Sequence, residues 1–142
     1  MSDLVRGTLV LTHAGARVAI DAALAHAESL GAAFNIAVTD AGGGLLAFAR
    51  MDGAFAMSAD IAIDKARTVV GFGGAHTDAL YAAIADEPAV RDGIAGRHGV
   101  AAFGGGVPIV IEDHLLGAVA ASGGSAAQDK AVAEAGAAAV AG

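Results

Sequence analysis

Apolar positions first repeat at helical spacing between Thr12 and about Leu30. Ala14, Val18 and Ala22 fall on one stripe of this segment, which is the pattern of a helix that packs one side against a core. The hydroxyl of Thr12 is suited to cap the first turn. We therefore expect an amphipathic helix over these residues.

The clearest strand signal lies in FNIAVTDA and LLAFARM, which three glycines separate. Alternation places Ile36 and Val38 on one side of the first strand, and glycines are common in tight hairpin turns. VPIVIE and LLGAVAA predict a second hairpin that turns about Asp113 and His114. A further short strand is expected around residues 100–103.

Polar caps mark three more helices. Ser58 is expected to cap a helix that runs through DKARTVV, and Thr77 is expected to cap a short helix over DALYAAIA. Ser125 and Gln128 have capping-box spacing at the start of an alanine-rich final helix. Because strands and helices do not alternate regularly, the order predicts one α+β domain over residues 1–142, with helices packed on an antiparallel sheet.

Composition adds an expectation about assembly. Alanine, valine and glycine supply most of the apolar residues, whereas aromatic residues make up only 4% of the chain. Small side chains let helices and sheets approach closely, but they bury limited area per residue. Association between copies of the chain is therefore expected to supply part of the stability.

Charge and cysteine content exclude several classes of partner. The net charge is −7 and the eight basic residues are scattered, so no nucleic-acid-binding surface is expected. No apolar run approaches the roughly eighteen residues of a membrane span, and the first residues lack the features of a signal peptide, so we expect a cytoplasmic protein. The absence of cysteine removes disulfides and thiolate ligands.

RMDGA places a cation and a carboxylate just after a predicted strand. Arg50 could bind a ligand carboxylate through its planar guanidinium, and Asp52 could hold Arg50 or accept a hydrogen bond from the ligand. An exposed ion pair beside a turn-forming Asp-Gly step explains the same residues. Both interpretations remain open at this point.

Lys65 lies among apolar and acidic residues of the second predicted helix. A partly buried lysine needs a partner, so it either pairs with Asp60 or Asp64 or faces an anionic group of a ligand. A solvated lysine is the alternative. Two carboxylates without a third ligand are weak evidence for a cation site.

The five histidines show no metal-ligand spacing, and a single histidine is more often a surface residue than a ligand. His26 and His76 have small neighbours that would let a flat group approach. Ser122 has no histidine partner in sequence, so a hydrolase triad is not supported. Gly123 and Gly124 could leave free N–H groups at the last helix for an anion, although a turn or packing role also explains them.

Five motifs in linear order carry a family resemblance. NIAVTDAGGGLLAFARMDGA, DKARTVV, HTDAL, GGGVPI and GAVAASGGSAAQDKAVAEAGAAA follow one another along the chain. This order resembles the GlcG/HbpS-like family of haem-binding and haem-degrading proteins, which also includes the C-terminal domain of some corrinoid adenosyltransferases. The resemblance covers Thr12 to Val140.

The resemblance implies a profilin-like three-layer α/β/α sandwich with a five-stranded antiparallel sheet. It also implies homo-oligomers, often large and built from dimers. Members have been linked to haem binding, to iron release from haem, and to accessory steps in aromatic or glycolate catabolism. Because no single reaction is shared by all of them, the fold alone does not establish the function.

The same resemblance assigns candidate site residues by position. Arg50 and Asp52 match the RMDG motif, and Lys65 matches a KA.T helix. Ser122, Gly123 and Asp129 match an SGG...D motif. The family's GVSG is AASG in this chain.

Two further matches concern haem itself. The resemblance ties a threonine at the position of Thr77 to haem ligation, and it places His26 in a helix that contributes a haem-proximal histidine in some members. The proline that usually precedes the threonine is His76 here, which adds a possible ligand or proton carrier.

Two functions follow as hypotheses. The first is an oligomeric protein that binds haem or a similar flat, anionic molecule, with Arg50 and Lys65 at its carboxylates and His26, His76 or Thr77 near the iron. The second is an enzyme or accessory protein for an organic acid, in which the same pocket orients a carboxylate and transfers protons.

Overall fold

The computed structural model describes residues 3–141 of the chain. Helices and strands follow one another in the described residues as α1 (His13–Ser29), β1 (Asn35–Asp40), β2 (Leu45–Arg50), α2 (Met57–Gly71), α3 (Thr77–Ile84), α4 (Pro88–Ala95), β3 (Gly106–Ile111), β4 (His114–Ser122) and α5 (Ala126–Ala141). The α+β class expected from the sequence is confirmed.

The strands form one antiparallel sheet in the order β2-β1-β4-β3. Each predicted hairpin supplies one half of the sheet, and the central pairing of β1 with β4 joins the halves. Glu112 and Asp113 have φ angles of 51° and 65° in the turn between β3 and β4, as a two-residue hairpin turn requires. In the other turn, Asp40 accepts hydrogen bonds from the N–H groups of Gly42 and Gly44. Both predicted hairpins are confirmed, but the second turns at Glu112 and Asp113, one residue earlier than expected, and His114 begins β4.

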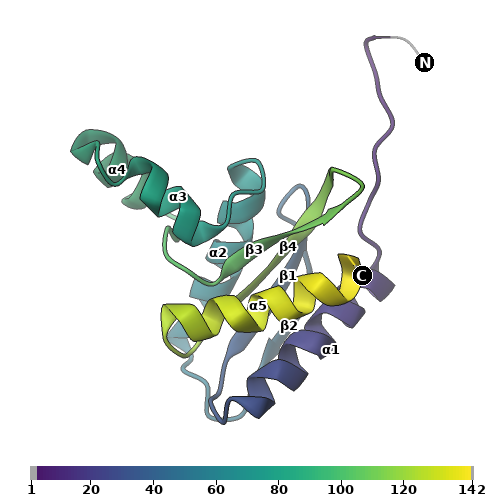
Figure 1. Cartoon of the computed structure of the whole chain (residues 1–142), viewed down its shortest axis with the longest axis vertical. Coiled ribbons are helices and arrows are strands. Elements are labelled where there is room, and N and C mark those ends of the chain that lie inside the picture. Colours follow the sequence, from purple (N-terminus) through teal and green to yellow (C-terminus); the bar gives the residue numbers. More distant parts are fainter. Residues whose placement is uncertain (1–2, 142) are drawn as a thin grey trace.

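Helices cover both faces of the sheet (Figure 1). Helices α1 and α5 lie side by side on one face, where the main core contains Ile36 and Val38, as the alternation predicted. Helix α2 covers the other face of β1, β4 and β3 through a smaller core of alanines and one valine. The small residues allow very close contact: a Cβ atom on Gly136 of α5 would lie 2.7 Å from the carbonyl oxygen of Ala19 in α1.

Helices α3 and α4 form an arm that projects from this layered body (Figure 1). Helix α4 has no buried residue and packs mainly on α3. Three residues of α3, Thr77, Leu80 and Ile84, are buried and attach it to the body. The arm therefore has a much smaller core contact than the sheet and its covering helices.

The fifth strand expected from the resemblance and around residues 100–103 is absent, since the described residues form a four-stranded sheet. The segment instead crosses over α2. The backbone N–H of Ala101 donates to Thr68 Oγ1 at 3.0 Å, and Phe103 turns its ring over the ammonium of Lys65. Gly105 then takes a φ of 136°, which brings the chain back into β3. These contacts with α2 replace strand pairing.

Two predicted helix caps are confirmed. The Oγ1 atom of Thr12 accepts from the N–H of Gly15 at 3.0 Å. Ser125 and Gln128 form the reciprocal capping box before α5, with bonds of 3.0 and 3.1 Å.

The caps expected at Ser58 and Thr77 are wrong. Helix α2 begins one residue before Ser58, at Met57, without a side-chain cap. Thr77 is the first residue of α3 rather than its cap, and its Oγ1 accepts from the N–H of Gly106 at 3.0 Å. At Thr77 this tertiary contact outweighs the local capping preference.

Candidate functional site

A buried ion pair joins α2 to α5 at one end of the sheet. The Nζ atom of Lys65 lies 3.0 Å from Oδ2 of Asp129, and both side chains are almost completely excluded from solvent. Lys65 Nζ also donates to the carbonyl oxygen of Ala121 at 3.0 Å, and the other oxygen of Asp129 accepts from the N–H of Gly124. The pairing with Asp60 or Asp64 considered from the sequence is therefore wrong.

Burial and the interaction with Asp129 act in opposite directions on the pKa of Lys65. Burial lowers the pKa of Lys65 below its ordinary value, and the charge and hydrogen bond of Asp129 offset part of that shift. The ring of Phe103 lies over the ammonium, with 4.5 Å between Nζ and the ring centroid, which is a cation–π contact. Removal of either Lys65 or Asp129 would leave an unpaired charge in a region that water does not reach.

Glycines make room for this pair. A Cβ atom on Gly105 would lie 2.5 Å from Lys65 Nζ and 2.7 Å from the carbonyl oxygen of Ala121. On Gly106 it would lie 2.8 Å from a methyl carbon of Thr77 and 2.9 Å from the carbonyl oxygen of Lys65. The structure thus brings Lys65 and Thr77 together at one place, and both are fully buried.

A groove runs along the exposed side of α3. One depression of about 340 Å³ lies between α3 and α5, and a second of about 250 Å³ lies between α3 and the loop before β3. Asp78 lines both, so the two depressions adjoin each other. We call this surface the α3 groove, lined by His76, Asp78, Ala79, Tyr81, Ala82, Ala102, Phe103, Gly104 and Lys130.

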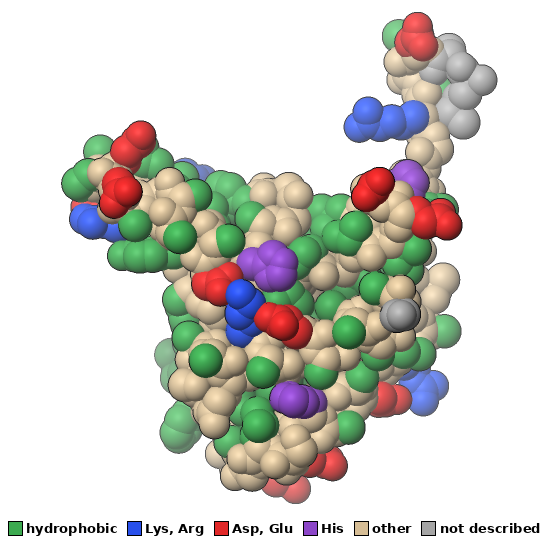
Figure 2. Space-filling model, viewed as in Figure 1, with side chains coloured by type: hydrophobic (Ala, Val, Ile, Leu, Met, Phe, Trp, Pro, Cys, Tyr) green, Lys and Arg blue, Asp and Glu red, His purple; other side chains and the backbone are tan. Residues whose placement is uncertain are grey.

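One end of the α3 groove is charged. Lys130 Nζ lies 2.7 Å from Oδ2 of Asp78 and 4.0 Å from a carboxylate oxygen of Glu134. Figure 2 shows the pattern on the surface: a histidine beside a lysine that has an acidic side chain on either side. The hydrogen bond between the partners lowers the pKa of Asp78 and raises that of Lys130.

His76 is the unusual polar group of the α3 groove. Its side chain does not cap α3, and within residues 3–141 its buried Nδ1 atom has no hydrogen-bond partner. Buried polar atoms are normally satisfied, so an orphaned ring nitrogen beside a depression needs an explanation. A bound ligand or a water molecule could form the missing hydrogen bond to this nitrogen.

The opposite end of the groove is apolar. Tyr81 and Phe103 are 43% and 49% exposed, although large aromatic side chains usually bury more of their surface. Together with Ala102 and Gly104 they present ring edges and small side chains to the depression. This end is suited to a flat apolar group.

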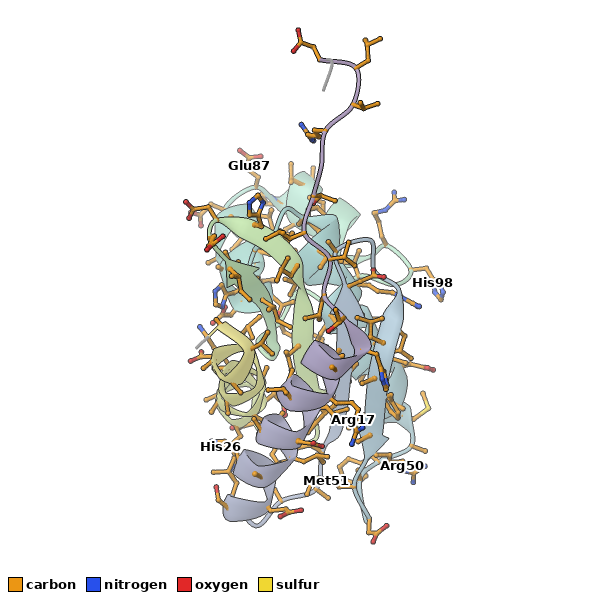
Figure 3. All side chains as sticks on the ribbon, turned by 90° about the vertical axis from the view of Figure 1, so that its right-hand side faces the viewer. Arg17, His26, Arg50, Met51, Glu87 and His98 are labelled. Atoms are coloured by element: carbon orange, nitrogen blue, oxygen red, sulfur yellow. The ribbon has the colours of Figure 1, made fainter. Side chains whose placement is uncertain are left out.

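Arg50 and Asp52 lie away from this groove. They line a separate depression of about 420 Å³ together with Leu24 and Glu28 of α1. Both side chains are exposed and form no ion pair with each other. Figure 3 shows His26 and Arg50 on opposite sides of α1. The structure therefore does not bring Arg50, Asp52 and His26 together with His76 and Thr77.

Ser122 ends β4, and Gly123 follows it, close to the buried ion pair. Ser122 is buried and pairs in register with Asn35, and a Cβ atom on Gly123 would lie only 2.3 Å from the carbonyl oxygen of Ala33. Gly123 is therefore required for backbone packing. Because Ser125, Gln128 and Asp129 already engage three backbone N–H groups around the start of α5, the anion site considered there is less open than the sequence suggested.

Sequence reasoning gave no role to Lys130, Asp78, Tyr81 or Phe103, and it noted Asp129 only as the acid of the SGG...D motif. One signal was available for Asp129, since it follows the capping box at a position from which its carboxylate can reach back to the preceding glycine turn. The others carry no local pattern. Among residues 3–141, no group of three or more metal-ligating side chains occurs, and no helix is long and apolar enough to cross a membrane.

Known proteins share this fold and these motifs. A curated relative, an uncharacterized 15.0 kDa protein in the dhaT-dhaS intergenic region of Citrobacter freundii, is 34% identical over 127 residues, which are 87% of each chain. The crystal structure of Klebsiella pneumoniae ORFY is 27% identical and superposes with a TM-score of 0.89, covering 99% of this chain and 97% of that one. PduOC, solved as a complex with heme, is 28% identical with a TM-score of 0.84, over 92% and 95% of the two chains.

The match to a family of proteins extends over most of the chain. The family described as "Haem degrading protein HbpS-like" matches residues 11–138. This range begins just before α1 and ends near the end of α5, so it includes the sheet, the buried ion pair and the α3 groove. The chain belongs to the HbpS-like family.

Proposed function

We propose that the protein binds haem, or a similar flat molecule with an anionic edge, in the α3 groove. The observation that carries the proposal is the combination of His76, whose buried Nδ1 has no protein partner within residues 3–141, and an apolar aromatic wall in two adjoining depressions. A binding site of this kind needs few polar groups and a largely apolar surface. Family membership and the solved complex of PduOC with heme support the same ligand class.

The three candidate iron ligands, His76, Thr77 and His26, are not equally suited to bind haem. His76 offers an imidazole, which is a common iron ligand, whereas Thr77 is buried and its hydroxyl is already occupied by Gly106. His26 is only half buried on α1 and is not part of the groove. His76 is therefore the residue that would hold the iron, while Thr77 positions the loop before β3.

The charged end of the groove suits the edge of such a ligand. Lys130 is about one-third exposed and could exchange part of its contact with Asp78 for a ligand carboxylate. Tyr81 and Phe103 would cover the apolar faces of the ring. Haem would supply its iron to whatever chemistry follows, and the chain would bind and orient it.

Further features belong to the same proposal. We propose a homo-oligomer built from dimers, because the exposed aromatics and the projecting arm leave apolar surface for a second copy. We also propose a cytoplasmic location, a profilin-like relation of the fold, and an accessory role in haem degradation, iron release or catabolism of small molecules. No residue of the α3 groove assigns a reaction.

A separate depression around Arg50 supports a second candidate function. Arg50 is a cation without an ion-pair partner in a depression that also holds Asp52 and Glu28, away from the α3 groove. A guanidinium there could bind the carboxylate of an organic acid, and the nearby carboxylates could accept a proton from it. A protein that ignores haem but is stabilised by a small carboxylic acid, and loses that stabilisation in Arg50→Met, would favour this function.

The test of haem binding is a titration with hemin followed by the Soret band. We expect a saturable shift in the wild-type protein and a dissociation constant at least about tenfold higher in His76→Ala. His114→Ala is the matched control, since His114 is exposed at the start of β4. A wild-type protein without a saturable shift would overturn haem binding, and an unchanged His76→Ala would overturn the assignment of His76.

A further inference from the structure

We propose that Lys65 is a second, closed subsite for a carboxylate, which opens onto the α3 groove when the ring of Phe103 swings away. The inference deepens the proposed function and rests on it for the class of ligand, a flat aromatic molecule with a free carboxylate. Phe103 would act as the gate and Lys65 as the anchor. Neither residue has that role in the function proposed above, where Lys130 alone meets the anionic edge.

The ammonium of Lys65 has one N–H donor without a strong hydrogen-bond partner. An ammonium has three N–H donors, and in Lys65 two of them have firm partners, Asp129 and the carbonyl of Ala121, each at 3.0 Å. The remaining side of Nζ faces the ring of Phe103, 4.5 Å from its centroid. A π face is a weaker partner for a cation than a carboxylate oxygen is.

Phe103 lies between the ammonium of Lys65 and the α3 groove. The ring touches the fully buried Nζ atom on one side, yet it is 49% exposed and lines the α3 groove on the other. Its backbone neighbours Ala102 and Gly104 are buried, so they hold the chain in place while the ring turns about its own side-chain bonds. A single side-chain movement therefore connects the groove with the ammonium.

Little space is left around Nζ on the side of Gly105. A Cβ atom there would lie only 2.5 Å from Nζ and 2.7 Å from the carbonyl oxygen of Ala121, which leaves the side that Phe103 covers for the approach of a ligand. Asp129 already balances the charge of Lys65, so a ligand is attracted by the third N–H donor of Nζ rather than by a net charge. A carboxylate is a stronger acceptor for that N–H than a neutral group is. The preference expected of the subsite is therefore one of hydrogen-bond strength.

The gate can be tested without any ligand, because Lys65 and Lys130 are the two lysines of the chain. Reductive methylation with formaldehyde and cyanoborohydride, followed by mass spectrometry, reports the accessibility of each amine, with the exposed Lys130 as internal standard. We expect Lys65 to react slowly in the wild-type protein and at least about fivefold faster in Phe103→Ala, since its third partner is gone. Phe72→Ala, which removes a similarly exposed ring outside the α3 groove, should leave the ratio unchanged.

The anchor is tested in the same experiment with benzoate and benzamide as probes. Benzoate should slow methylation of Lys65 in Phe103→Ala, and the uncharged benzamide should not. If Lys65 stays unreactive in Phe103→Ala, Phe103 is not the gate; if both probes protect equally, Lys65 is not a carboxylate subsite. Either result overturns the inference, whether or not the protein binds haem.

Haem selectivity provides the second arm. In wild-type protein, hemin should bind at least about fivefold more tightly than its dimethyl ester, which lacks free carboxylates. This preference should disappear in Lys65→Met/Asp129→Asn, which removes the cation without leaving its partner charged, and should persist in Phe72→Ala. A preference that survives the double variant but is lost in Lys130→Met assigns the carboxylate to Lys130 and overturns the subsite. Absence of hemin binding to wild type would contradict the proposed function and leave the methylation result to decide the inference.

Discussion

Two lysine–aspartate pairs connect α5 to the rest of the molecule, and they differ in almost every physical respect. Lys65 and Asp129 are hidden from solvent and share their surroundings with a carbonyl oxygen, a ring and closely packed glycines. Lys130 and Asp78 lie at the surface, with a shorter contact of 2.7 Å. Distance alone would rank the surface pair as the stronger. Breaking the buried pair is nevertheless the more destabilising change. Water can hydrate the surface partners when they separate, but it does not reach the buried ones.

The largest effect on the free energy of unfolding is expected when only one partner of the buried pair is replaced. Lys65→Met should lower the free energy of unfolding by about 3 to 5 kcal/mol, because Asp129 keeps its charge in a dry site. Lys65→Met/Asp129→Leu should recover most of that loss, since no charge is then buried. Urea denaturation followed by circular dichroism measures both. If the double variant is as unstable as the single one, then burial of an unpaired charge is not the cause.

A smaller effect is expected when the space beside the pair is filled. Gly105→Ala should cost about 1 to 3 kcal/mol, because the added methyl group meets Lys65 Nζ and the carbonyl oxygen of Ala121 and the position has a φ of 136°. Gly71→Ala is the matched control, since no atom lies within 4 Å of its Cβ position. Thermal unfolding of the two variants should therefore separate. Equal melting temperatures would show that the loop before β3 yields to the methyl group.

The smallest effect is expected at the surface pair, and its pH dependence has the opposite sign. Lys130→Met should cost no more than about 1 kcal/mol at neutral pH and low salt. Because the folded-state pKa of Lys130 is raised above 10.5, this contribution is present below that value and is lost as the pH rises through the folded pKa. The pKa of Lys65 is lowered, so its contribution to stability grows as the pH rises from that lowered pKa towards 10.5.

Urea midpoints of wild type, Lys130→Met and Lys65→Met/Asp129→Asn across the alkaline range provide the check. The stability difference between wild type and Lys130→Met should shrink with rising pH. The difference between wild type and the double variant should shift in favour of wild type. A common trend in both comparisons would contradict the opposite pKa shifts.

The same contrast explains which features could be predicted from the sequence. The two hairpins, the cap at Thr12 and the capping box at Ser125 depend on residues a few positions apart, and all of these are confirmed. Lys65 and Asp129 are 64 positions apart, and their contact exists only because α2 and α5 meet at one end of the sheet. No local spacing encodes that meeting.

Failures at Thr77 and residues 100–103 have a related cause. The hydroxyl of Thr77 was expected to cap its own helix. In the folded chain it accepts a hydrogen bond from the backbone N–H of Gly106 instead. The segment before β3 has strand-like residues, yet its contacts with Thr68 and Lys65 draw it over α2. His76 was predicted as a site residue because of its neighbours in sequence; the groove beside it depends on Lys130, which is remote in sequence.

The weak attachment of the projecting arm has a consequence for motion. Because α4 buries no residue and α3 is held by only three, the backbone amides of the arm should exchange with solvent through local opening, while those of β1 and β4 exchange only when the whole domain unfolds. One wall of the α3 groove therefore belongs to a unit of low local stability and the other to the rigid body. A molecule larger than the resting groove can enter at the cost of displacing two short helices, without any disturbance of the sheet.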